Sequence, residues 1–319
     1  MARLDVTETV VAAATRTAAR PLAGIALKIA ATLAFSLMAA IARWLGDAYP
    51  LGQLVFFRAS FALVPIACLM LFSGTKLSEL KTTRPLSHLL RSMAGVSAMF
   101  SYFAALAFLP LADVTAIGFA SPLFVVALAA VVLGEQVHIY RWSAVAVGFA
   151  GVLIMVSPHL GGSASDSPIW GVLFASAAAV FSAFAMVAIR RMASTESATA
   201  IALYFQATCT AVSLATLPFA WVTPSLRDLL LLMLMGVFGG FGQLFMTNSY
   251  RFAQASLIAN FDYVAMIWAI LLGWFLFGEL PAAAVYIGAV IVIGSGLFIA
   301  WRERQLGLER ASEQATEVV

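Results

Sequence analysis

Charge is scarce in this sequence. Only 10% of its 319 residues are Asp, Glu, Lys or Arg, whereas 63% are hydrophobic and the mean hydropathy is +0.99. A soluble domain of this length needs many more polar side chains to cover its surface, so most of the chain is expected to lie in lipid. The net charge of +3 indicates no nucleic-acid partner.

Residues that carry catalysis or bind metals are also scarce. The two cysteines, Cys68 and Cys209, lie inside apolar segments, and the three histidines stand apart near predicted loops. A phosphate-binding G-x-x-x-x-G-K-[ST] motif does not occur. We therefore expect no disulfide, metal, cofactor or ATP hydrolysis. An integral-membrane enzyme that acts on a lipid or small molecule remains the alternative, although no clustered nucleophile or acid/base pair is visible.

What the sequence has in abundance is long apolar runs. A helix needs roughly 20 apolar residues to cross a bilayer, and Pro, Gly and charged residues divide the chain into runs of about this length. An all-α polytopic protein is predicted, with Pro65 and Pro122 expected to kink or break their spans. The ten predicted transmembrane spans are 22–43, 51–72, 88–108, 114–133, 140–157, 168–189, 199–220, 229–249, 256–277 and 283–301.

The Lys and Arg residues predict the orientation of these spans. If the N-terminus is cytoplasmic, only Arg43 and Arg227 among the flanking basic residues fall on the far side, which agrees with the positive-inside rule. Both termini are therefore predicted to be cytoplasmic. Residues 1–21 form a polar tail without a signal-peptide core, and residues 302–319 are expected to be a frayed tail.

The sequence also repeats itself weakly. The segment SPLFVVALAAVVLGEQ from Ser121 aligns with AMIWAILLGWFLFGEL from Ala265, and Phe35-Ser36 falls over Phe181-Ser182. Because each half, 22–157 and 168–301, contains an odd number of spans, the halves are predicted to be inverted repeats. Such repeats enclose a site near the membrane midplane and expose it to alternate sides.

These residues carry a family resemblance. The segments at 253–281 and 109–136, together with the FFR triplet that ends at Arg58, are similar to EamA-type members of the drug/metabolite transporter superfamily. The resemblance implies a bacterial inner-membrane secondary carrier, with a homodimer left open. Similar members export amino acids, drugs or metallophores, or take up S-adenosylmethionine or riboflavin. The implied cavity is lined by spans three, four, eight and nine and flanked by spans one, two, six and seven. Neither the substrate nor the direction of transport follows.

Candidate substrate-binding residues are polar or aromatic side chains inside the spans. A buried charge in lipid is costly, so Arg58 is expected to face a partner or a wet cavity and to bind an anionic or amphipathic solute. For the polar residues, hydrogen bonding between helices is an equally good explanation. The full set is Arg58, Tyr102, Ser121, Gln243, Asn260, Tyr263 and Trp268.

Candidate gating or coupling residues are charged. Asp262 is the carboxylate inside a span, and Lys28 or Arg91 enters from the same face and can pair with it. For both cations, extension of the side chain to the headgroups is the alternative. The equivalent Glu135 and Glu279 each follow a glycine at a span end and serve either as gates or as helix punctuation.

Overall fold

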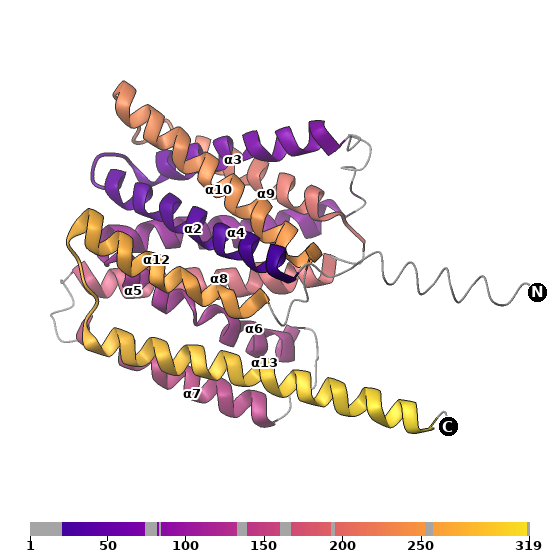
Figure 1. The fold of residues 1–319 in the computed structure, drawn as a ribbon. Coiled ribbons are helices and arrows are strands. Elements are labelled where there is room, and N and C mark those ends of the chain that lie inside the picture. The colour runs from indigo at the N-terminus through magenta and orange to yellow at the C-terminus, as the bar shows by residue number, and fades with distance from the viewer. Residues whose placement is uncertain are drawn as a thin grey trace, which may run out of the picture.

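The computed structural model of this chain describes residues 21–73, 82, 84–132, 139–159, 167–192, 195–252 and 258–317. The regular secondary structure of these ranges is helical and contains no strand, as predicted. The helices lie roughly along one common direction and form a bundle (Figure 1). The N-terminal tail predicted at 1–21 lies outside the described residues except for its last residue.

The described part of the first half contains six helices and a short 3-10 turn. The segment predicted as one span at 114–133 is interrupted at Phe119 and Ala120, just before the Ser121-Pro122 pair that begins α6, and so forms two helices. By contrast, α3 continues through Pro65, where a kink or break was expected. The elements are α2 (Pro21–Leu45), α3 (Leu51–Ser73), α4 (Pro85–Phe108), α5 (Leu111–Gly118), α6 (Ser121–Val132), α7 (Ile139–Val156) and η2 (Ser157–His159).

The second half has a similar succession with two differences from the prediction. α9 ends at Leu214, earlier than the predicted 220, and α13 runs on to Glu317 instead of ending near 301. The elements are α8 (Ser167–Met192), α9 (Ala198–Leu214), α10 (Leu226–Phe252), η3 (Ala259–Tyr263), α12 (Val264–Leu272), η4 (Gly273–Phe277) and α13 (Ala283–Glu317).

Local sequence signals set several helix ends. α4 begins with Pro85, whose fixed φ suits the first helical position. Ser197 caps α9, because its hydroxyl accepts a hydrogen bond from the backbone N–H of Ala200 at 3.1 Å. Gly278 ends η4 with a φ of 67°, in the left-handed region that glycine adopts without strain.

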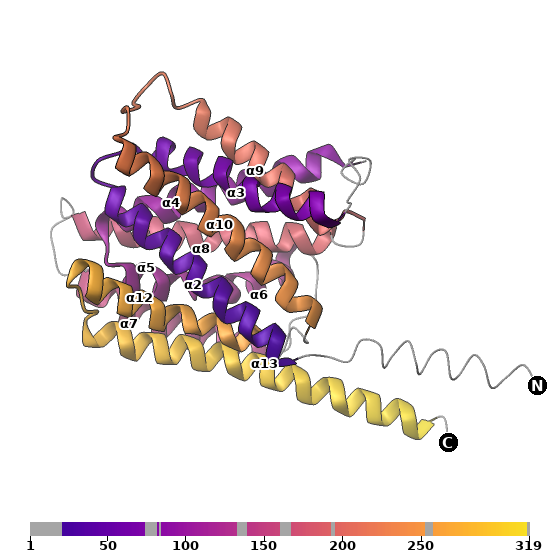
Figure 2. The same cartoon turned by 45° about the horizontal axis from the view of Figure 1, so that its top comes forward.

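Eight of the described helical segments are long and apolar enough to cross a membrane. Two shorter apolar segments, Thr199–Leu214 and Phe261–Phe277, lie where the seventh and ninth spans were predicted. The predicted frayed tail is helical as far as Glu317, and its polar residues extend α13 past the bundle at the end where α2 begins (Figure 2). Hydropathy could not predict this extension, because a hydropathy profile detects only the apolar part of a helix.

Three helix pairs make the most extensive contacts: α2 with α10, α4 with α8, and α7 with α13. In the last pair Gly151 and Gly288 bring the two backbones close together, because a Cβ on either glycine would clash with the other helix. We call the end of the bundle near Lys28 the Lys28 end and the opposite end the Arg43 end. Buried residues such as Leu45, Leu106, Leu109 and Leu232 fill the Arg43 end.

Candidate functional site

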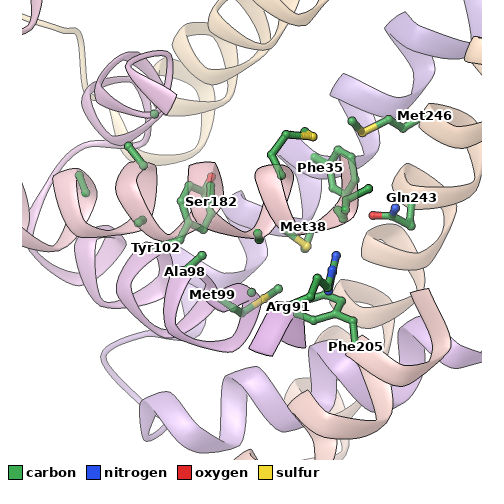
Figure 3. A pocket seen from close by; sticks show the side chains of 18 of the residues that line it. Phe35, Met38, Arg91, Ala98, Met99, Tyr102, Ser182, Phe205, Gln243 and Met246 are labelled. Carbon is green, nitrogen blue, oxygen red and sulfur yellow. The ribbon is translucent and has the colours of Figure 1, made fainter. Parts of the chain in front are cut away.

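A cavity of about 440 Å³ lies between α2, α4, α8 and α10, and α5 and α9 complete its wall (Figure 3). This volume is within the range of sites for small organic ligands. The lining combines aromatic, methionine and small side chains with a few polar groups. It consists of Phe35, Met38, Arg91, Gly95, Ala98, Met99, Tyr102, Val114, Gly118, Ala175, Ala178, Ala179, Ser182, Ala185, Met186, Ile189, Phe205, Gln243 and Met246.

Small residues on α8 create much of this space. Ala175, Ala178, Ala179, Ser182 and Ala185 recur at intervals of three or four residues, so they lie on one face of the helix. Their short side chains leave room between α8 and the helices opposite. This face therefore forms a smooth wall with a single hydroxyl, from Ser182.

Arg91 is the charged residue of the described lining. Its side chain enters from the second turn of α4, is only 8% exposed, and has no hydrogen-bond acceptor for Nε or Nη1 within the described residues. Its guanidinium carbon lies 4.2 Å from the ring centre of Phe205. Gly95, one turn further along α4, permits this arrangement, because a Cβ there would lie 2.6 Å from the Phe205 ring.

Arg58 lies beside the same aromatic ring but does not line the cavity. Its Nη1 donates a hydrogen bond of 2.9 Å to Oε1 of Gln206, and its guanidinium carbon lies 5.9 Å from the centre of the Phe205 ring. The residue is 4% exposed. The sequence assigned substrate contact to Arg58 and gating to Arg91, whereas the cavity is reached by Arg91.

Two ion pairs connect α2 to the region of the predicted ninth span. One involves Asp262 in η3, and the other involves Glu279, which follows η4. At one end of α2, Nζ of Lys28 lies 2.7 Å from Oδ1 of Asp262 in η3, and the two side chains are 1% and 46% exposed. At the other end, Arg43 pairs with Glu279 and also donates to the carbonyl of Leu106 at 2.8 Å. Of the two cations predicted to reach Asp262, the structure selects Lys28. Both pairs are formed in the same conformation.

The remaining predicted residues are divided between the cavity and other contacts. Tyr102 and Gln243 line the cavity. Tyr263 packs edge-on against Phe119, with ring centres 5.2 Å apart, and Trp268 is partly buried outside the lining. Ser121 begins α6, also outside the lining. Glu135 and the side chain of Asn260 lie outside the described residues.

Sequence reasoning overlooked most of the lining. Phe35, Phe205 and the small face of α8 are not among the predicted residues. One signal pointed to them: Phe35-Ser36 aligns with Phe181-Ser182, and the cavity is lined by Phe35 from the first pair and Ser182 from the second.

The histidines, predicted to be isolated, pair with carboxylates where they are described. Nε2 of His88 lies 3.2 Å from Oε2 of Glu196, and Nε2 of His159 lies 2.9 Å from Oδ2 of Asp113. The third, His138, lies outside the described residues. No group of three His, Cys, Asp or Glu side chains in the described ranges is arranged to hold a metal.

Comparisons with known proteins find relatives over most of the chain. The EamA-like transporter family matches residues 22–157 and 169–301. The chain is 31% identical over 271 residues to the pseudopaline exporter of Pseudomonas aeruginosa, with 85% of this chain and 93% of that protein covered. It is 29% identical over 265 residues to the S-adenosylmethionine uptake transporter of Rickettsia prowazekii, with 83% and 88% covered.

Two further matches cover most of the chain. The riboflavin transporter of Rhizobium johnstonii is 27% identical over 283 residues, covering 88% of this chain and 91% of that protein. A solved crystal structure has the same fold, with a TM-score of 0.63 at 22% identity, and the match covers 89% of this chain and 98% of that one.

Proposed function

Because this chain belongs to the EamA-like transporter family, we propose that it moves a small organic metabolite across the bacterial inner membrane by alternating access through the central cavity. The observation that carries this proposal is the cavity itself, which is enclosed by helices from both family-matched segments. α2, α4 and α5 come from the first segment, and α8, α9 and α10 come from the second. The site is thus a membrane-embedded space suited to an organic solute.

Helix neighbours support ten spans arranged as inverted repeats. In an inverted repeat, α2 is equivalent to α8, and α4 is equivalent to α10. The contact of α2 with α10 is then equivalent to the contact of α8 with α4, and these two contacts are the largest in the bundle. The α3–α10 contact is likewise equivalent to the α9–α4 contact. A pseudo-two-fold axis in the membrane plane accounts for this correspondence.

The ion pairs at the two ends of α2 are suited to gating. Lys28 and Arg43 are separated by about 22 Å at 1.5 Å per helical residue, so each pair lies near one mouth of the bundle. Alternating access requires helices at one mouth to separate while those at the other stay closed. Breaking either pair exposes charges that are otherwise neutralised, which favours discrete open and closed states.

The positive-inside rule supports a cytoplasmic Lys28 end with both termini inside. The cavity includes Arg91 and Met246, which lie toward the Lys28 end of α4 and α10. The Arg43 end is filled by buried leucines. With this proposed orientation, the cavity lies closer to the cytoplasmic side and the buried leucines close the periplasmic mouth.

Proteoliposomes provide the test. We expect purified protein to catalyse counterflow of at least one solute from a panel of riboflavin, S-adenosylmethionine and amino acids, and to release it chemically unchanged. A tryptophan at Ala178 fills the cavity and should abolish counterflow. Phe184→Trp, on the lipid-exposed side of the same helix, is the matched control and should retain it. Chemical conversion of a panel member would instead favour the enzyme alternative.

A further inference from the structure

Two arginines beside the cavity have no counterion. Neither Arg58 nor Arg91 forms an ion pair with any carboxylate of the described residues. Nε of each, and Nη1 of Arg91, also have no described hydrogen-bond acceptor. Both guanidinium groups lie against the ring of Phe205, which attracts them through its π face but neutralises neither.

Four carboxylates of the described residues are engaged in pairs with other side chains. Asp262 pairs with Lys28, Glu279 with Arg43, Asp113 with His159 and Glu196 with His88. Each of these pairs lies near an end of the bundle. The positive charges of Arg58 and Arg91 therefore have no neutralising partner among the described residues. They lie inside the bundle, where solvent screening is weakest.

The exposed face of Arg91 is directed into the cavity. Figure 3 shows its guanidinium group pointing toward Gln243, with Phe205 beside it and Met38 above the α4 backbone. A planar guanidinium recognises a carboxylate through parallel N–H donors. Apolar and aromatic lining farther along the cavity suits the rest of an organic molecule.

We propose that the cavity binds organic solutes that carry a carboxylate and have a net negative charge, and that Arg91 holds the carboxylate. Arg58 adds positive potential from beside Phe205 without contacting the solute. The described lining contains no Asp or Glu that could hold an ammonium group. This assignment of substrate class builds on the proposed transport function, and it disfavours cationic solutes in the same site.

The test compares acids with their uncharged analogues. N-acetyl-L-tyrosine, hippurate and indole-3-acetate, each with its primary amide, are titrated by calorimetry into the purified full-length protein. We expect at least one acid to bind tenfold or more tightly than its amide. Arg91→Gln should remove this difference, and Arg91→Lys should retain part of it and controls for folding. Arg227→Gln, at an exposed arginine, should behave as the unaltered protein.

Several results would overturn the assignment. One is that no acid binds more tightly than its amide, and another is that the preference persists in Arg91→Gln. Counterflow in proteoliposomes separates this assignment from the transport proposal. Flux of neutral solutes that is independent of Arg91 would refute the anion site and leave transport standing. Arg91-dependent binding of acids without flux of any solute would support the anion site and refute transport.

Discussion

The ion pair between Lys28 and Asp262 is expected to control how fast the protein changes conformation. The ammonium group of Lys28 is almost completely buried, and apart from Asp262 its described hydrogen-bond partner is the hydroxyl of Tyr250 at 3.4 Å. Asp262→Asn therefore leaves a buried cation with weak compensation wherever α2 and η3 remain in contact. We expect transport to slow more than solute binding weakens.

The magnitude follows from the exposure of the two partners. Removing one partner of a fully buried ion pair costs about 3–5 kcal/mol, whereas exposed pairs contribute about 0.2–1 kcal/mol. Here one side chain is buried and the other is 46% exposed, so we expect about 1–3 kcal/mol. If the pair forms in only one of two states, their equilibrium shifts roughly 5- to 150-fold.

The assay measures counterflow rate and solute affinity in parallel at several pH values. The charge swap Lys28→Glu with Asp262→Lys should recover part of the lost rate, and Asp47→Asn, at an exposed carboxylate, should have no effect. Unchanged rate and pH dependence in Asp262→Asn would mean that the carboxylate neither gates nor carries a proton. Equal losses in rate and affinity would mean that it acts on the solute site instead.

Three further predictions address topology, pH and packing. Cysteines at Lys81 and Asp166 should react with impermeant reagents from opposite sides of the membrane, and labelling of both from the periplasm would contradict the ten-span arrangement. A hydrogen bond from Thr82 lowers the pKa of Glu196 below its usual value. The Glu196 carboxylate therefore stabilises the fold fully above about pH 4.3, and this contribution is lost as the pH falls further. Glu196→Gln should make the unfolding temperature fall less at acid pH, as measured by thermal unfolding. Gly288→Leu should lower stability by about 1–3 kcal/mol, measured by unfolding in detergent, because its side chain would collide with α7.

Hydropathy predicted the positions of the apolar helices because long apolar runs have few alternatives in lipid. The break near Pro122 was also predictable, since proline has no N–H to continue the hydrogen bonding of a preceding helix but fits the first turn of a new one. Pro65 lies in the interior of α3, yet the helix continues. Chain-local signals could not separate these two cases, because the outcome depends on how neighbouring helices compensate for the missing hydrogen bond.

The site was less predictable than the spans. Sequence depth indicated that Arg58 faces protein or a wet cavity and left Arg91 between a partner and the headgroups. It carries no information on which face of the cavity each side chain reaches. That choice depends on Phe205, which lies on a different helix, and on Gly95, which lets the ring approach α4. Alanines lining α8 were also invisible to a search for polar residues, because a cavity is created by side chains that are small.

The distribution of charge gives the arginines their significance. Retaining a charge at membrane depth is costly, and this chain offsets the cost by pairing carboxylates with lysine, arginine or histidine near both ends of the bundle. Arg58 and Arg91 are exceptions, and they enter from opposite ends of the bundle on α3 and α4 yet meet at Phe205. A packing role alone would be served as well by methionine or leucine, without the desolvation cost. Uncompensated cations at this one place are best explained by a negative charge that the solute brings.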